Sequence, residues 1–275
     1  MRIARLLLRF VALGAGLVAC PSCDSQFGDT PAPTFEPNPE GNDKRIRQIA
    51  DPSSVDYVKS GGSVAVSGAV VVAVDTYDET HNGKSQGTIY VADMGSQEPY
   101  SGISLFNPSW VPGNLRVGPG DALDLRGTYQ ENNTVPIQFA PGAFLVQIAN
   151  PIGTFRFEAT LPDPVVIPDI KKLAKYETGR PYLNMIVTVR DVTVQGDLLT
   201  APASGRMSAK LMPEESFPKC EEPGDKAPTI VNELMDLAPL QIAAGTKLKS
   251  LTGIVTFFCN LHIAPRTPAD IVIDK

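Results

Sequence analysis

The chain has 275 residues, which is enough for two domains of ordinary size once a leader and a tail are set aside. Its formal net charge is −6, from 24 basic and 30 acidic residues, and neither half of the chain carries a basic excess. This balance argues against a protein that follows nucleic-acid phosphates along a basic groove.

The first nineteen residues have the pattern of a secretory leader. Three arginines come first, an apolar run over residues 10–18 follows, and a small residue, Ala19, precedes Cys20. The apolar run is shorter than the roughly 20 residues that a helix needs to cross a bilayer. The sequence therefore predicts a cleavable signal peptide over residues 1–19.

The end of this leader, the motif LVAC at residues 17–20, resembles the lipobox of bacterial lipoproteins. The resemblance implies that Cys20 is lipidated and becomes the first residue of the mature protein, which is then held to a membrane by its acyl chains. It also implies the outer membrane rather than the inner one, because Pro21, and not an aspartate, follows the modified cysteine. An ordinary secretory leader that is cut elsewhere is the alternative.

Cys20 and Cys23 also have the Cys-x-x-Cys spacing of a redox pair. A Cys20 linked to lipid through a thioether cannot cycle with Cys23, and no strand-then-helix pattern surrounds the motif. We therefore do not favour redox catalysis, and Cys23 remains either free or available for a bond between chains.

Residues 20–43 are predicted to form a disordered tether. The segment is rich in Pro, Asp, Asn and Glu, and it holds five acidic residues and no basic one. Such a composition cannot build a hydrophobic core, so we expect an extended, solvated linker between the lipid and the folded part of the chain.

The following residues, 44–160, are predicted to form a first β domain. Short apolar or alternating runs are separated by Gly, Pro and Asn, which is typical of strands joined by turns. The five strands are expected over residues 61–75, 87–95, 101–109, 117–129 and 136–146.

Residues 161–275 repeat this order at an offset of about 120 residues, and they are predicted to form a second β domain. The corresponding strands are expected over residues 180–194, 205–212, 228–235, 243–257 and 261–265, with LHIAP (261–265) aligned to IQFAP (137–141). The fourth strand of the second copy has one extra residue between its glycines, which indicates a β-bulge. A short helical stripe over residues 168–179 is expected to connect the copies.

Five strands that close within about 100 residues fit the OB-fold, a partly open Greek-key barrel. An immunoglobulin-like sandwich is the rival, but it needs about seven strands per domain. The first copy is similar to OB-type modules of secreted bacterial proteins, on the segments at residues 64–75, 87–93, 101–106 and 117–129. Such modules often occur in tandem, sometimes beside extracellular nuclease domains, but no nuclease domain is recognisable in this sequence. The expected fold class is thus all-β, with two tandem five-stranded OB-like barrels.

The other two cysteines, Cys220 and Cys259, lie in the second half of the chain. An extracytoplasmic location permits disulfides, and this pair would close a loop of about 40 residues. We predict that they are bonded to each other, with two separate thiols as the alternative.

No motif for catalysis or for metal binding is found. The two histidines, His81 and His262, fall at different positions of different repeats, and both are expected at the surface. Cys259 and His262 form a lone C-x-x-H, whereas a zinc site needs four ligands. The acidic residues before His81, from Asp75 to Glu79, are a conceivable cation loop, but they lack the spacing of a Ca²⁺ loop. We expect no enzyme activity, no metal and no cofactor.

Binding is the remaining class of function. OB barrels bind ligands on the face of their second and third strands, where this chain has Tyr90 and Phe106, with Trp110 just beyond. The alternative, which we favour, is that Phe106 and Trp110 close the end of the barrel. We expect a non-catalytic envelope lipoprotein that binds or scaffolds a protein or an envelope polymer. Extracellular nucleic-acid binding, or a role as accessory to a secreted nuclease, is the second hypothesis.

Overall fold

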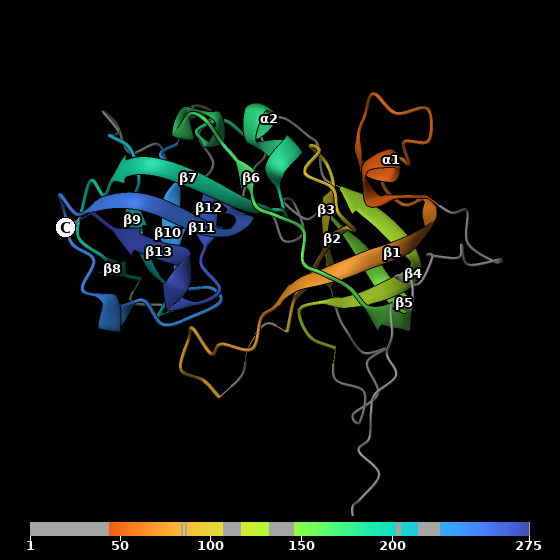
Figure 1. The fold of residues 1–275 in the computed structure, drawn as a ribbon, viewed down its shortest axis with the longest axis horizontal. Coiled ribbons are helices and arrows are strands. Elements are labelled where there is room, and N and C mark those ends of the chain that lie inside the picture. Colours follow the sequence, from red (N-terminus) through yellow and green to blue (C-terminus); the bar gives the residue numbers. More distant parts are fainter. Residues whose placement is uncertain are drawn as a thin grey trace, which may run out of the picture. The chain divides into compact units, whose positions relative to one another are not determined.

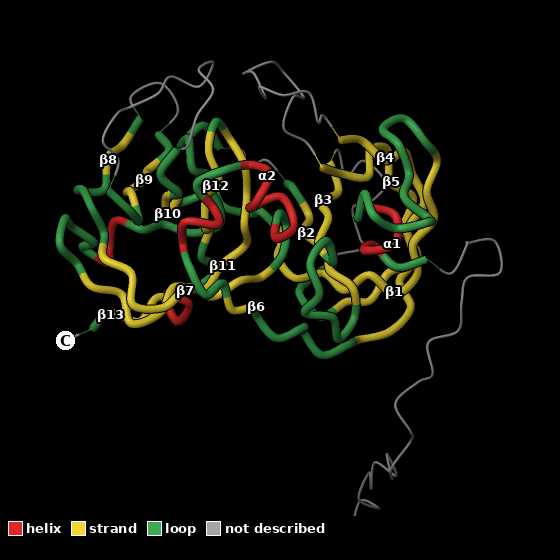
Figure 2. Tube along the Cα trace, turned by 90° about the horizontal axis from the view of Figure 1, so that it is seen from above, coloured by secondary structure: helices red, strands yellow, loops and turns green. Residues whose placement is uncertain are grey.

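The structure is a computed structural model, and it describes residues 44–83, 85, 87–106, 117–131, 146–201, 205–213 and 226–274. All of these residues belong to one compact unit, Phe35–Lys275. They form two groups of strands with only short helices, as the strand and helix colours of Figure 2 show. No helix in the described part of the chain is long and apolar enough to cross a membrane. The leader and the tether lie outside the described residues.

The first group of strands closes into a barrel (Figure 1). Its order is β1-β2-β3-β5-β4, with β4 pairing back to β1, and every pair is antiparallel except β3 with β5. The strands are β1 (Ser63–Val74), β2 (Ile89–Asp93), β3 (Gly102–Phe106), β4 (Asp121–Glu131) and β5 (Val146–Glu158). The closed five-stranded barrel that the sequence predicts for the first half is therefore confirmed.

The long, valine-rich strand β1 pairs with two neighbours, and this is what closes the barrel. Its first part pairs with β4 and its second part with β2. The two pairings overlap at Ala69 and Val70. Gly68 lies in the register shift against β4 between Val66 and Ala69, and its φ of 66° is in the left-handed region that glycine adopts at little cost. A short helix, α1 (Ile46–Ala50), precedes the barrel, and its Ile46 and Ile49 are buried in the core. The sequence pattern did not indicate this helix.

The second group of strands is an open eight-stranded sheet. Its order is β6-β7-β11-β12-β10-β9-β8, and β13 pairs with β11 beside this path. The strands are β6 (Val165–Val166), β7 (Ile186–Thr193), β8 (Leu199–Thr200), β9 (Met207–Lys210), β10 (Thr229–Val231), β11 (Lys247–Phe258), β12 (Asn260–Ala264) and β13 (Ile271–Ile273). The prediction that the second half closes into a barrel is therefore wrong, because β7 and β9 do not pair with each other as β1 and β2 do.

Apart from this opening, the second sheet repeats the strand order of the first. Its pairs β7–β11, β11–β12, β12–β10 and β10–β9 match β1–β4, β4–β5, β5–β3 and β3–β2, and the pair between third and fifth strands is again parallel. Val64 pairs with Gly127 in the barrel, as Val187 pairs with Gly253 in the second sheet. Counting on from these pairs, Asp191 takes the place of Gly68 and has a similar φ of 53°.

Two details of the predicted repeat change. The fifth strand of the first half begins at Val146, so most of the segment predicted for it, residues 136–146, lies outside the described residues. The counterpart of Leu261–Ala264 is then Val146–Ala149, because Ile230 pairs with Ile263 as Leu105 pairs with Ile148. In β11, a register shift against β13 between Leu248 and Ser250 lies in the stretch where the extra residue predicts a bulge.

Three short helical turns link the two groups: η1 (Ile170–Leu173), α2 (Tyr176–Gly179) and η2 (Arg180–Tyr182). They replace the single helical stripe that the sequence predicts over residues 168–179. The other helical turns, η3 (Ala238–Leu240) and η4 (Pro268–Asp270), lie in the second half.

Gly253 of β11 lies closely against the backbone of β12. A Cβ atom at this position would lie 2.5 Å from the carbonyl oxygen of Ala264. We expect Gly253→Ala to lower the free energy of unfolding by about 2 kcal/mol, because backbone atoms must move to relieve the contact. Gly196→Ala is the matched control, since its added Cβ would meet nothing within 4 Å. Equal urea denaturation midpoints for the two variants would contradict the expectation.

Candidate functional site

The face on which the sequence places a ligand is covered. Tyr90 is 4% exposed, and every residue of β2 is buried. Tyr90 packs in an apolar cluster that joins β1 and β2 of the barrel to Ile186 of β7 and Ile254 of β11. The structure therefore does not present Tyr90 on an exposed face, because the second half of the protein occupies its side of the barrel. The side chain of Phe106 and all of Trp110 lie outside the described residues.

A polar cluster surrounds this covered face. The hydroxyl of Tyr90 donates to the carboxylate of Glu233, which also accepts a hydrogen bond of 2.8 Å from Thr256. Arg206 of the second half donates twice to Glu79 of the barrel, at 3.2 and 2.7 Å. The Tyr90–Glu233 and Arg206–Glu79 bonds join side chains 143 and 127 residues apart in sequence, so they fix the barrel to the second sheet.

His262 is buried, and the expectation that it lies at the surface is wrong. It is 5% exposed on β12, with Nδ1 2.5 Å from the hydroxyl of Thr229 and Nε2 3.0 Å from the carbonyl oxygen of Phe258. Burial, together with the nearby charge of Arg206, lowers the pKa of His262 to about 3. Its ring is therefore neutral at physiological pH, with Nε2 donating to Phe258 and Nδ1 accepting from Thr229.

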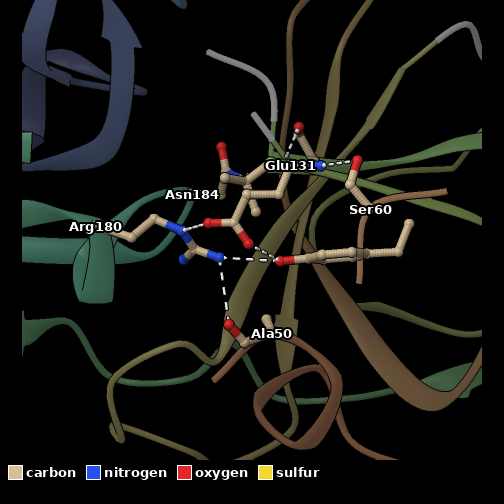
Figure 3. Close-up of polar contacts among 8 residues, drawn as sticks. Ala50, Ser60, Glu131, Arg180 and Asn184 are labelled. Atoms are coloured by element: carbon tan, nitrogen blue, oxygen red, sulfur yellow. Dashed lines mark hydrogen bonds and ion pairs between the residues drawn. The ribbon is translucent and has the colours of Figure 1, made fainter. Parts of the chain in front are cut away.

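A second polar cluster fixes the linker to the barrel and is drawn in Figure 3. Arg180 of η2 reaches Glu131 at the end of β4 with an Nε–Oε1 distance of 2.5 Å. It also donates to the hydroxyl of Tyr129 at 3.2 Å and to the carbonyl oxygen of Ala50 at 3.4 Å. Burial works against the charge of Arg180, but the hydrogen bond and ion pair with Glu131 outweigh it and raise the pKa of the guanidinium.

Asn184 completes this joint. Its side-chain amide donates to the carbonyl oxygen of Val146 at 2.9 Å, and its backbone has a φ of 65°. Gly102 of β3 lies directly against it, since a Cβ on Gly102 would be 2.6 Å from the carbonyl carbon of Asn184. These contacts show that the charged and polar residues at the joint between the two halves have a structural task.

The acidic loop before His81 is closed on itself. The carboxylate of Asp78 accepts backbone hydrogen bonds from Asn82 at 3.1 Å and from Gly83 at 2.6 Å, and these bonds lower its pKa against the effect of desolvation. His81 itself is exposed, as expected. Glu79 is engaged with Arg206, so the acidic residues point to different partners. Among the described residues, no group of three or more His, Cys, Asp or Glu side chains could hold a metal ion.

Cys259, at the turn between β11 and β12, is disulfide-bonded. The other three cysteines, Cys20, Cys23 and Cys220, lie outside the described residues, so the predicted partner, Cys220, remains a prediction. We expect Cys220→Ser to leave Cys259 as a free thiol that reacts with a maleimide after unfolding, while Cys23→Ser leaves it protected. A Cys259 that stays protected in Cys220→Ser would exclude this pairing.

A groove of about 350 Å³ lies where the second sheet stays open. It is lined by residues 167–171 after β6, residues 189–193 of β7, Gln195, and residues 211–213 after β9. Because β7 and β9 are the strands that would have to pair to close this sheet, the groove occupies the unclosed seam. We call it the seam groove.

The walls of the seam groove mix apolar and charged side chains. Ile170 and Met212 supply partly buried apolar surface, and four charged residues line the groove: Asp169, Lys171, Arg190 and Asp191. The two acidic and two basic side chains balance, so the groove carries no formal net charge. Such a lining suits a ligand that has both apolar and polar groups and little net charge.

The hydrophobic pattern of the sequence does not predict this groove. Its one visible signal is the pair Arg190–Asp191, two charged residues inside a run of Val and Thr that otherwise has the pattern of a buried strand. A strand with such a pair in its middle is exposed there on at least one side. The absence of the β7–β9 pairing, which creates the groove, leaves no trace in the hydrophobic pattern.

Comparison with known proteins gives no further assignment. No protein-family model matches the chain, and no curated protein matches it significantly. The fold and the seam groove are therefore the observations from which a function can be argued.

Proposed function

We propose that the protein is a non-catalytic binding or scaffolding module of the cell envelope, whose partner is a protein or an envelope polymer. The observation that carries the proposal is the seam groove, an accessible concave surface of the described chain. The charged residues of the two buried clusters, such as Glu79, Glu131 and Arg180, are engaged in joining the halves. This supports a binding role more than a catalytic one.

We further propose that both halves are OB-type Greek-key units, the second one opened at a single seam. The strand order β1-β2-β3-β5-β4 and its return in the second half support this assignment. In this scheme the binding surface has changed place, because the β2 face of the first unit is occupied by the second unit. The burial of Tyr90 also removes the main support for nucleic-acid binding, since stacking on bases requires an exposed aromatic face.

A lipid anchor at Cys20 is the part of the proposal that places the module at the membrane. The support is the leader pattern with its lipobox-like end and the acidic tether that follows. We expect radiolabelled palmitate to be incorporated into the full-length chain and into Cys23→Ser, but not into Cys20→Ser. Equal labelling of all three would exclude Cys20 as the lipidated residue.

The binding role is tested by affinity capture from envelope extract with the full-length chain carrying a C-terminal tag. Arg190→Trp places a large side chain in the seam groove, and Lys249→Trp makes the same change at an exposed residue of β11 that does not line it. We expect one dominant partner with the wild type and with Lys249→Trp, and its loss with Arg190→Trp. Capture that is the same for all three proteins would contradict a role for the groove.

A further inference from the structure

The open seam has the features of a site for an added β-strand. We propose that the seam groove binds an extended peptide segment of a partner protein, which pairs with the edge of β7. This inference rests on the proposed function of the groove and specifies its ligand. In this mode of recognition, main-chain hydrogen bonds provide affinity and alternate side chains provide specificity.

Within the described residues, the edge of β7 that faces the seam is paired only at its two ends. At one end the amide of Ile167, just after β6, donates to the carbonyl oxygen of Thr188 at 2.9 Å. At the other end the amide of Gln195 donates to the carbonyl oxygen of Lys210 at 2.9 Å. Between these bonds, no strand of the described chain pairs with β7 on this side.

Successive residues of a strand direct their backbone N–H and C=O groups to opposite sides, and this alternation shows which groups of β7 face the seam. Because the main chain of Thr188 faces β6, that of Arg190 faces the same side. The left-handed residue Asp191 then shifts the alternation, and Val194 bonds to the β11 side, where its amide donates to Thr246 at 2.9 Å. Thr193 therefore faces the seam, and its carbonyl oxygen accepts from the side chain of Gln195 at 2.9 Å.

The first repeat shows this position filled. The counterpart of Arg190 there is Ser67, which directly precedes the left-handed residue Gly68 as Arg190 precedes Asp191. The amide of Ser67 donates at 3.0 Å to the carbonyl oxygen of Lys44, in the segment that leads into α1. The same fold thus accepts a backbone segment at this point of its first strand.

The barrel also shows what lies farther along the same edge. Beyond Gly68, residues 69–74 pair with β2, and the carboxylate of Asp93 at the end of β2 holds the first amides of α1, from Ile46 at 2.7 Å and Arg47 at 3.0 Å. In the described part of the second sheet, the corresponding bond is the one from the amide of Gln195 to the carbonyl oxygen of Lys210. The groove therefore lies at the position that β2 and the segment before α1 occupy in the barrel.

The charges that line the seam groove favour a peptide over a polyanion as its ligand. A polyanion such as a nucleic acid needs an excess of Lys and Arg along its path. The seam groove has two acidic and two basic residues, and its apolar wall includes Ile170 and Met212. A peptide backbone with alternating side chains matches both features, since it is uncharged along the strand edge and offers apolar groups to one wall.

The first test uses a phage-displayed library of linear peptides, selected on the full-length chain in detergent. We expect enrichment of peptides without proline in their central residues. An N-methyl scan of an enriched peptide removes one main-chain donor at a time. Binding should weaken about tenfold at every second position and change little at the positions between, because only alternate amides face β7. Losses without this period of two would overturn strand addition.

The second test places the peptide in the groove. Arg190→Trp should weaken binding of the enriched peptide at least about tenfold, while Lys249→Trp should not change it; thermal unfolding checks that both variants fold. Independently of any variant, peptide binding should slow hydrogen exchange of the Arg190 amide. Failure to enrich a peptide, or an unprotected Arg190 amide, would overturn the inference. The partner captured from envelope extract and lost in Arg190→Trp would then still support the groove as a binding site for another ligand.

Discussion

Replacement of Arg180 by methionine should lower the free energy of unfolding by about 3–5 kcal/mol. The substitution removes the cation of a buried ion pair and leaves the Glu131 carboxylate, in a side chain only 4% exposed, without its charged partner. The hydrogen bonds to Tyr129 and to the carbonyl oxygen of Ala50 are lost at the same time. Urea denaturation of the full-length protein at neutral pH measures the effect.

Two further variants distinguish the effect of breaking the buried Arg180–Glu131 pair from the effect of removing any positive charge. Arg180→Met combined with Glu131→Gln should recover part of the loss, because a neutral amide is less costly to bury and still accepts from Tyr129. Arg47→Met removes a cation that lies 3.6 Å from Glu98 with both side chains about half exposed or more, and it should change stability by no more than about 0.5 kcal/mol. A loss in Arg180→Met as small as that in Arg47→Met would show that Glu131 does not depend on the pair.

The same residues show why this joint was not predictable from the sequence. Arg180 and Glu131 are 49 positions apart, and nothing in the local pattern of either marks it as buried. Hydrophobic periodicity reports which side of a strand is apolar, so it located most strands of both halves. The order of these strands, together with glycines at matching points of the fourth strand, Gly127 and Gly253, also revealed that the two halves repeat. It carries no information on which polar side chains meet when two sheets pack together.

Tyr90 illustrates the same limit at the candidate site. A tyrosine in a strand fits an exposed stacking face and a buried position equally well, because its ring is apolar and its hydroxyl needs only one partner. Here Glu233, 143 residues away in sequence, provides that partner. The ligand surface consequently could not be placed from the pattern of the barrel alone. The seam is open because β7 and β9 do not pair, and no local sequence pattern shows that.

His262 should make the protein sensitive to mild acid. Its pKa is lowered to about 3 in the folded protein, against about 6.5 in an unfolded chain. A group whose folded-state pKa is lowered contributes stability that is fully present above the unfolded value and is lost as the pH falls below it. From pH 8 to pH 5 the free energy of unfolding of the wild type should fall by about 2 kcal/mol through this group. The reason is that His262 binds a proton in the unfolded chain at pH 5 and stays unprotonated in the folded protein.

His262→Gln isolates this contribution. The barrel has Gln147 at the corresponding position of its fifth strand, so this fold accommodates a buried glutamine there. At pH 8 the variant should be close to the wild type, and at pH 5 it should be the more stable of the two. The pKa of Asp93 is raised to about 6, mainly by burial, so this carboxyl changes stability in the opposite direction between about pH 4 and 6. Asp93 is present in both proteins, so the difference between their urea titrations reports on His262 alone. Parallel pH profiles would mean that the ring at position 262 is protonated in the folded protein as readily as in the unfolded chain.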